Sequence, residues 1–193
     1  MQFIANTFLP FSSLGFNAYD DTPWILRLMD FIRMILAQDR VRIIGVCFGH
    51  EIIGRVLGLP VARGELGWQI SVVPMSLTPS GRELFKGRLQ PDSLSIMQMH
   101  RDIVAAEPEQ LPDGVENLAA TEGCKIQGMY KKGVLISTQG HPEYHPDIMY
   151  EFITVRKKLG FFAPAMAKDG LKRMSDPHDG VVVGCAFLRF LME

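Results

Sequence analysis

An apolar, strand-like run that ends abruptly in a cysteine constrains this chain more than any other feature. Residues 41–51 read Val-Arg-Ile-Ile-Gly-Val-Cys-Phe-Gly-His-Glu, so β-type residues give way at Cys47 to glycine and helix-forming residues. Gly45 and Gly49 leave room for a strained backbone on either side. The pattern predicts a nucleophile elbow, a sharp strand-to-helix turn that lifts the Cys47 side chain out of the end of a sheet.

The helix expected after Cys47 adds an electrostatic argument. Its N-terminus points unpaired N–H groups and the positive end of the helix dipole toward the sulfur, which favours thiolate over thiol. Cys47 is therefore a candidate nucleophile. The alternative is a small apolar residue buried at a strand end, since free cysteines are among the most buried residues.

A second β-branched run leads into a histidine and a carboxylate. Residues 136–144 read Ile-Ser-Thr-Gln-Gly-His-Pro-Glu-Tyr. His141 and Glu143 are two residues apart in extended chain, so they project to the same side, and Pro142 stiffens the segment between them. A thiol that attacks an amide needs an imidazole to move its proton and a carboxylate to orient that imidazole. The two segments together predict a Cys-His-Glu triad.

These segments resemble the class I glutamine amidotransferase family, whose elbow reads G-x-C-x-G-x-Q and whose base lies in a G-H-P-E segment. The resemblance extends from Asn17 to Glu151, and within the family it points to a stand-alone fungal and plant subgroup that includes γ-glutamyl peptidases. It implies that Cys47 is the nucleophile, His141 the general base and acid, and Glu143 the orienting carboxylate. Further similar segments lie at residues 17–25, 67–68, 77–81, 98–102 and 126–129.

The resemblance also implies a fold and a substrate pocket. The fold is an α/β architecture with an open, mainly parallel sheet flanked by helices, of the flavodoxin-like kind. Phe48, Glu51, His100 and Arg101 are implied to bind the substrate, and neither a cofactor nor a metal is implied. The segment His100-Arg101-Asp102 has a second interpretation, a hydrogen-bonded loop junction at a strand end.

Glu51 departs from the family pattern, because the family usually has Gln at this position. An ionised carboxylate accepts hydrogen bonds but cannot donate them, and its charge one helical turn past Cys47 opposes thiolate formation. We therefore expect a slight shift toward a non-standard substrate. The alternative is a solvated Glu51 on the first turn of the helix. We place His50 on that turn rather than in the pocket, and Trp68 in the core rather than over the substrate.

The start of the chain also departs from the family. Family members place several strands and a helix here, ending in a Gly-rich turn that helps to stabilise the oxyanion, whereas residues 3–15 offer at most one short strand, broken by Pro10. We expect an atypical N-terminal segment at residues 1–16 and an amidotransferase-like domain at 17–160 that lacks the first strands of the family fold. Residues 161–193 are expected to form a C-terminal extension that packs on the domain.

Composition limits the class of protein. The 193 residues, 47% of them hydrophobic, suit one globular core. A net charge of −1 and the lack of a Lys/Arg run argue against nucleic-acid binding, and the interrupted apolar N-terminus argues against a signal peptide or membrane span. We expect a cytoplasmic protein with a small-molecule partner. Three cysteines without a C-x-x-C pair argue against a disulfide framework or zinc site, so Cys124 and Cys185 are interpreted as structural.

Hydrophobic periodicity predicts the remaining elements. Thr22 and Pro23 are expected to open a helix whose apolar face runs from Trp24 to Leu36, and the helix after Cys47 should end near Gly58. The other expected elements are extended segments within 61–75, a helical turn at 80–85, strands at 93–99, 123–129 and 134–138 with a hairpin turn at 131–133, and a helix at 147–159 with Ile148, Phe152 and Val155 inward. Residues 181–192 fit a buried helix or a strand, and their apolarity fits a dimer contact as well.

The expected reaction is hydrolysis of a γ-glutamyl amide, in glutamine or a γ-glutamyl peptide, through a γ-glutamyl thioester on Cys47. A glutaminase would pass ammonia to a synthase on a separate chain, whereas a γ-glutamyl peptidase would act alone. Two alternatives remain open at this point. One is a catalytically inactive binding or regulatory paralogue that keeps the scaffold, and the other is a truncated fragment of the family.

Overall fold

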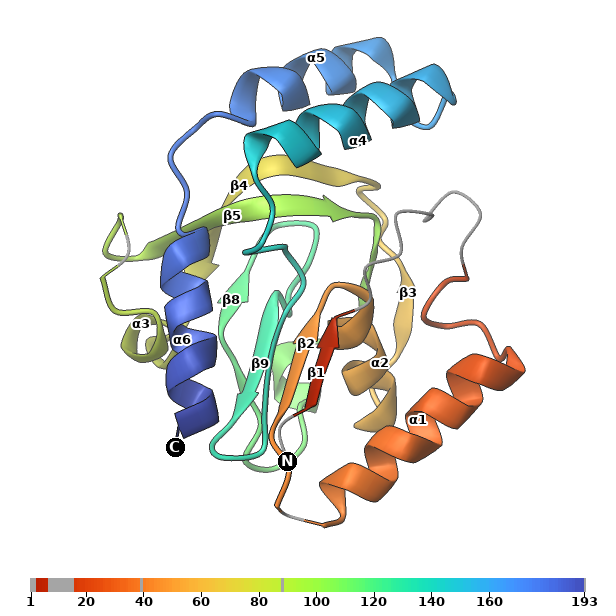
Figure 1. Ribbon diagram of the computed structural model, residues 1–193, viewed down its shortest axis with the longest axis vertical. Helices are drawn as coiled ribbons and strands as arrows, with labels where there is room; N and C mark the ends of the chain where they lie inside the picture. Colours follow the sequence, from red (N-terminus) through yellow and green to blue (C-terminus); the bar gives the residue numbers. More distant parts are fainter. Residues whose placement is uncertain (1–2, 7–15, 39, 88, 193) are drawn as a thin grey trace.

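A computed structural model of the protein describes residues 3–6, 16–38, 40–87 and 89–192. Helices and strands alternate only from β1 to β3, most of the later strands follow one another directly, and three helices end the chain (Figure 1). The helices are α1 (Pro23–Leu36), α2 (Phe48–Val56), α3 (Pro79–Leu84), α4 (Pro146–Lys158), α5 (Pro164–Arg173) and α6 (Gly180–Met192), with a 3₁₀ turn at Pro108–Gln110. The strands are β1 (Phe3–Asn6), β2 (Ile43–Val46), β3 (Val61–Arg63), β4 (Gln69–Leu77), β5 (Ser93–His100), β6 (Asp102–Val104), β7 (Glu116–Asn117), β8 (Ala119–Ala120), β9 (Gly128–Lys131) and β10 (Leu135–Thr138).

The main sheet has five strands in the order β1, β2, β10, β9, β7. β1 and β10 lie parallel to β2 on its two sides, and β9 and β7 continue the sheet antiparallel. β9 and β10 form the predicted hairpin, with Gly133 at a φ of 67° in the turn. Because Val46 pairs with Thr138, the carboxyl ends of β2 and β10 lie side by side.

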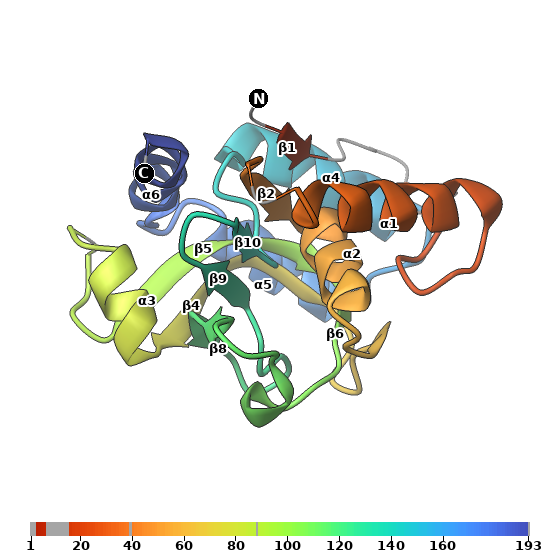
Figure 2. The ribbon, with the colours of Figure 1, turned by 90° about the horizontal axis from the view of Figure 1, so that it is seen from below.

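Both faces of the parallel part of the sheet are covered. Successive strand residues point to opposite faces, and Ile43 accordingly packs into a core cluster with α1 and α2, whereas Ile44 packs with α6 and β5. Leu135 and Ile136 of β10 divide in the same way. Figure 2 shows α6 and the α1–α2 pair on opposite sides of these strands. A parallel sheet buried on two faces explains the uninterrupted apolar run before Cys47.

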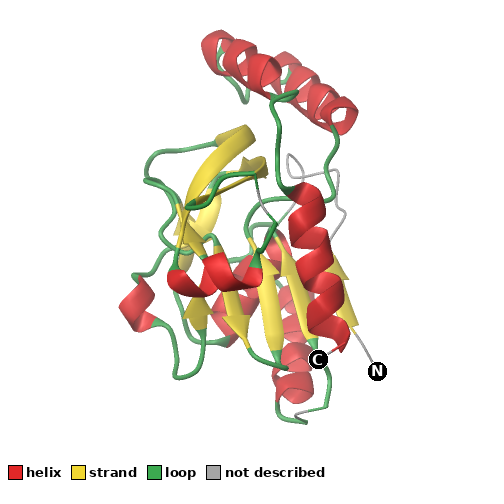
Figure 3. Cartoon of the chain, turned by 90° about the vertical axis from the view of Figure 1, so that its left-hand side faces the viewer, coloured by secondary structure: helices red, strands yellow, loops and turns green. Residues whose placement is uncertain are grey.

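A second, antiparallel sheet lies beside the first. β4 pairs with β5 from Gln69–His100 to Ser76–Ser93, and β8 adds a short third strand, while β3 and β6 form a separate two-stranded ribbon. α4 and α5 pack together beyond β4 and β5 (Figures 1 and 3). A third core cluster, which includes Ile70, Met97 and Phe162, joins these helices to the sheet.

Several predicted elements match the structure closely. α1 begins at Pro23 after Thr22, and its buried residues fall on the predicted stripe. α2 ends at Val56, with Gly58 at a φ of 84° just beyond it. Residues 180–192 form a helix, which settles the choice left open by their sequence. The predicted short N-terminal strand is present as β1, whereas Pro10 and the turn expected before Phe16 lie outside the described residues.

Three expectations were wrong in detail. α4 buries Met149, Ile153 and Arg156; of the predicted inward residues Phe152 packs against the core but Val155 is 46% exposed, because the contacts with β4, β5 and α5 select a different stripe. The strand predicted from residue 123 begins only at Gly128, and an isolated bridge between Thr121 and Cys124 precedes it. Cys124 is buried as a structural cysteine should be, but Cys185 is exposed on α6.

Candidate functional site

Cys47 occupies the predicted elbow between β2 and α2. Its φ of 52° and ψ of −107° are strained for a residue with a Cβ. Its backbone N–H donates to the Thr138 carbonyl at 2.9 Å, which ties the elbow to β10. A Cβ at Gly45 would lie 2.9 Å from the Gly49 backbone, so glycine at position 45 allows α2 to approach β2 closely.

His141 and Glu143 follow the carboxyl end of β10. His141 Nδ1 lies 2.9 Å from Glu143 Oε1, and the His141 backbone N–H donates to the Met97 carbonyl at 2.7 Å. A carboxylate only accepts hydrogen bonds, so the proton of the neutral imidazole is on Nδ1 and Nε2 is free to accept another. The geometry is that of a base held in its productive tautomer.

The elbow and the His-Glu pair therefore lie next to each other. Both follow strands that run parallel and in register, with Val46 opposite Thr138, and open α/β sheets form their sites at the carboxyl ends of such strands. The charge of Glu143 acts on the Cys47 thiol and contributes to raising its pKa. The three residues predicted to form a triad thus all follow the carboxyl ends of two neighbouring parallel strands, β2 and β10.

A small cavity of about 100 Å³ opens beside Cys47. The four predicted substrate-binding residues, Phe48, Glu51, His100 and Arg101, all line it. The other lining residues are Phe16, Asn17, Ala18, Trp68, Met99 and Asp102. Residues far apart in sequence thus converge on the candidate nucleophile, although no spacing pattern in the sequence relates Phe48 to His100.

Glu51 is buried, contrary to the solvated alternative. Its side chain is almost inaccessible at 4% exposure, and its Oε1 accepts a hydrogen bond of 2.9 Å from Gln139 Nε2. Burial raises the pKa of Glu51 to about 8, a shift that the Gln139 bond opposes and the charge of Asp102 reinforces. At neutral pH the side chain is therefore mostly a neutral carboxylic acid, which donates as well as accepts hydrogen bonds.

The thiol of Cys47 is not pre-ionised, which corrects the expectation from the helix dipole. Burial raises the pKa of Cys47 well above its usual value, and Glu51, Glu143 and Asp102 raise it further. The hydrogen bond from the Phe48 backbone N–H is the opposing influence. One N–H and a dipole of nine residues do not offset desolvation and three acidic neighbours.

Gln139 links the two sides of the site and was missed by sequence reasoning. Its Nε2 donates to Glu51 and also lies 3.9 Å from Cys47 Sγ, while its Oε1 is buried without a hydrogen-bond partner among the described residues. Gln139 lies two residues before His141 in a bend that follows β10, so strand alternation does not indicate it from the sequence.

Two buried histidines, His50 and His100, differ in their hydrogen bonds, and only His100 lines the cavity. His50 lies on the first turn of α2, as predicted, and bridges to β10 through Ser137 Oγ at 2.9 Å and to the Ile126 carbonyl at 3.1 Å. His100 donates from Nδ1 to the Asp102 carbonyl at 3.0 Å, which leaves its buried Nε2 as an acceptor without a partner among the described residues. Burial lowers the pKa of His50 to about 4 and that of His100 to about 3.

Aromatic side chains and one arginine form part of the cavity wall. The Arg101 guanidinium lies 5.3 Å from the Trp68 ring centre, and Trp68 packs edge-on against Phe162. Trp68 is therefore both part of the core, as predicted, and part of the cavity wall. On the opposite wall, Phe48 stacks on Trp24 of α1 at 5.6 Å between ring centres.

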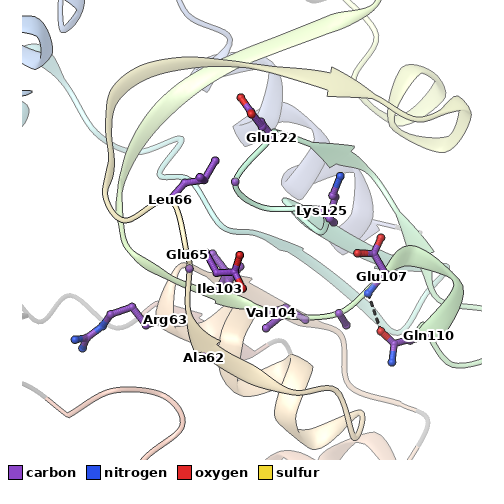
Figure 4. A pocket seen from close by; sticks show the side chains of 14 residues that line it. Ala62, Arg63, Glu65, Leu66, Ile103, Val104, Glu107, Gln110, Glu122 and Lys125 are labelled. Atoms are coloured by element: carbon purple, nitrogen blue, oxygen red, sulfur yellow. Dashed lines mark hydrogen bonds between the residues drawn. The ribbon is translucent and has the colours of Figure 1, made fainter.

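A larger cavity, of about 360 Å³, lies elsewhere, between β3, β6 and the loop around residue 123 (Figure 4). Its charged lining side chains, such as Glu65, Glu107 and Lys125, are exposed, and none of the seven predicted site residues lines it. We assign the site to the smaller cavity because that one contains Cys47. Across the described residues, no cluster of three or more potential ligands is arranged to hold a metal ion, and no helix is long and apolar enough to cross a membrane.

Comparison with known proteins identifies the family. The model of the glutamine amidotransferase class-I family matches residues 15–155, and the chain belongs to that family. A glutamine amidotransferase-like protein of Schizosaccharomyces pombe is 30% identical over 92% of this chain and 68% of its own length. Gamma-glutamyl peptidase 4 of Arabidopsis thaliana is 32% identical over 74% of this chain and 55% of its own length.

Two further comparisons extend the picture. A subunit of the glutamine-hydrolysing GMP synthase of Archaeoglobus fulgidus is 35% identical over 65% of this chain and 67% of its own length. The crystal structure of a glutamine amidotransferase from Methylobacillus flagellatus superposes with a TM-score of 0.73 at 21% identity, over 92% of this chain and 73% of that one. The fold is thus the predicted class I glutamine amidotransferase α/β fold. The chain spans between about half and two thirds of the length of the three relatives compared by sequence.

Proposed function

We propose that the protein hydrolyses a γ-glutamyl amide with Cys47 as the nucleophile. The observation that carries the proposal is the position of a strained cysteine elbow beside a histidine whose Nδ1 is held by a carboxylate 2.9 Å away. Membership of the glutamine amidotransferase family supports the γ-glutamyl amide as the substrate class.

The reaction follows from the proton positions. Because the pKa of Cys47 is raised, the thiol attacks as His141 Nε2 removes its proton, without a resting thiolate. Sγ bonds to the γ-carbonyl carbon, and the carbonyl π electrons move onto the oxygen. They return to re-form the carbonyl as the C–N bond breaks, and His141 gives its proton to the departing nitrogen in the same step. Water, activated by the same imidazole, attacks the γ-glutamyl thioester and releases the acid and the thiol.

The neutral form of Glu51 bears on the choice of substrate. A buried carboxylic acid offers one donor and one acceptor to a ligand, as the amide of the usual Gln does, until it ionises around pH 8. The relatives include gamma-glutamyl peptidases and one component of a glutamine-hydrolysing synthase. We propose γ-glutamyl peptides as the first substrates to test, and glutamine with a synthase on a separate chain as the second.

A second candidate function is ligand binding without turnover. One observation favours it: the thiol is shifted away from its reactive form by burial and by Glu51, the residue that departs from the family pattern. Such a protein would bind a γ-glutamyl compound in the same cavity, and replacement of Cys47 would leave its binding unchanged.

The test is covalent labelling by a glutamine-analogue electrophile, measured as intact mass. The variants are Cys47→Ala and, as a matched control, Cys185→Ala, which removes an exposed free cysteine. We expect one adduct that persists in Cys185→Ala, disappears in Cys47→Ala and is suppressed by excess γ-glutamyl peptide or glutamine. Circular dichroism shows whether each protein is folded. A folded wild-type protein that binds these compounds and stays unlabelled would instead establish the binding function.

A further inference from the structure

A column of aromatic rings begins at the candidate base and runs into the helical layer formed by α4 and α5. The Tyr144 ring lies flat on the His141 imidazole, with 3.9 Å between ring centres and 7° between planes. Tyr144 also meets Phe152 edge-on at 5.4 Å between ring centres, and the buried Arg156 guanidinium lies 5.0 Å from the Phe152 ring centre. Nothing in the triad chemistry uses these residues.

The stack supplies a constraint that the carboxylate cannot. The hydrogen bond to Glu143 fixes one edge of the imidazole at Nδ1, but a single bond leaves the ring free to rock about that contact. A flat ring pressed against the imidazole face fixes its plane. Tyr144 and Phe152 are themselves packed against the core cluster between α4 and the second sheet, so the platform is part of a packed layer and not a loose loop.

The strength of the stacking between Tyr144 and His141 also changes during the reaction. An aromatic face attracts a cation through its quadrupole, so Tyr144 interacts more strongly with the imidazolium that forms during attack than with the neutral ring before it. Interactions that strengthen along the reaction lower the barrier, whereas those equal in both states do not. The contact therefore acts on turnover more than on substrate affinity.

We propose that Tyr144 is a positioning residue for His141, holding the imidazole plane toward Cys47 and stabilising its protonated form through ring stacking. The inference rests on the proposed function, because it assumes that His141 is the base. The aromatic ring carries the effect, and the hydroxyl group does not. The pair Tyr144→Phe and Tyr144→Leu separates these two parts of the side chain.

The kinetic test compares kcat and KM for a γ-glutamyl substrate. We expect Tyr144→Phe to stay within twofold of wild type, and Tyr144→Leu to lose about three- to tenfold in kcat, the range of one aromatic pair, with KM within twofold. Tyr150→Leu, on the exposed face of α4, is the matched control and should be unchanged. An unchanged kcat in Tyr144→Leu overturns the proposal, as does an equal loss in the Phe variant or a change confined to KM.

A second readout does not depend on turnover. In protein labelled with ¹⁵N-histidine, the His141 signals are assigned by their absence in His141→Ala. We expect a single ordered Nδ1–H tautomer in wild type and Tyr144→Phe, and exchange between ring states in Tyr144→Leu. Identical His141 spectra in all three proteins contradict positioning. If wild type fails to hydrolyse any γ-glutamyl compound, the proposed function fails, and this spectral comparison alone decides the role of Tyr144.

Discussion

The two sides of the candidate site lie on neighbouring parallel strands, yet their surroundings differ. On the base side, His141 has a carboxylate at 2.9 Å and a stacked ring at 3.9 Å, so its tautomer and plane are both set. On the nucleophile side, burial raises the pKa of the Cys47 thiol, and Glu51 raises it further once it ionises, around pH 8. Under the proposed function, the scaffold prepares the proton acceptor more completely than the proton donor, and we expect His141 to carry more of the barrier.

Removal of the base should have the largest effect. We expect His141→Ala to lower kcat by at least about 10³-fold, because a thiol with a raised pKa has no other route for its proton. Steady-state hydrolysis of a γ-glutamyl peptide measures the loss. His145→Ala is the control, since that exposed side chain lies only four residues away. A loss in kcat below tenfold would mean that Cys47 ionises without His141. The base side would then not be the better prepared of the two.

Changing the tautomer of His141 should lower kcat less than removal of His141 does, but still strongly. In Glu143→Gln, the new amide can donate to Nδ1, which moves the imidazole proton to Nε2 and blocks acceptance from Cys47. The amide can also turn its oxygen to Nδ1–H, so some productive tautomer remains. We expect kcat to fall about 10²-fold, while Glu151→Gln, an exposed replacement on α4, leaves it unchanged. Equal kcat values in the two variants would show that the 2.9 Å contact does not set the tautomer.

Much of this architecture could be predicted because its causes are local. The elbow at Cys47, the stripe of α1 and the β9–β10 hairpin each follow from residues a few positions apart, and the structure has all three. The contact of His141 with Glu143 is also local, but it was predicted for the wrong reason, because Pro142 and Glu143 form a turn instead of extended chain.

The remainder depends on contacts between distant segments. Burial of Glu51 is set by Gln139 and by cavity residues that come from the loop before α1, from Trp68 and from the junction of β5 and β6, which no spacing within α2 reveals. The inward face of α4 was mispredicted for the same reason, since Met149 and Ile153 pack against residues of β4, β5 and α5 that are distant in sequence. Charge state, in particular, follows from packing, so the direction of the Cys47 pKa could not be read from the helix dipole alone.

Replacing Glu51 with a neutral residue should make the Cys47 thiol easier to ionise and so reduce the difference between the two sides. We expect a moderate effect on the reactivity of Cys47. In Glu51→Gln, made in a Cys185→Ala background, we expect iodoacetamide to alkylate Cys47 faster than in the parent protein. The gain should be small at pH 6, where Glu51 is protonated, and should grow to about tenfold by pH 9, because its pKa is about 8.

The control for this series is Glu109→Gln, which changes the same charge at an exposed position. Rates are measured by intact mass at fixed intervals of pH. A ratio of variant to parent that stays constant from pH 6 to 9 would show that Glu51 does not ionise in this range, and that its charge does not contribute to the raised pKa of Cys47.

The last prediction concerns the free energy of unfolding and not the reaction, and it is a stability maximum at a particular pH. His50 and His100 stay neutral in the folded state below pH 6.5, whereas the unfolded chain binds protons there, so stability falls as pH decreases toward 4. Glu51 keeps its proton up to about pH 8 in the folded state and loses it near 4.5 when unfolded, so stability also falls as pH rises between those values. Each group contributes at most about 1.4 kcal/mol per pH unit. Below pH 6.5 the effect of the two histidines on stability is larger than that of the one carboxyl, and above pH 6.5 only the carboxyl acts. The free energy of unfolding, measured with urea, should therefore be highest near pH 6.5. Glu51→Gln should remove the decline toward pH 8 and steepen the fall below pH 6.5, because the carboxyl no longer opposes the two histidines there. A decline toward pH 8 that persists in this variant would show that another group causes it.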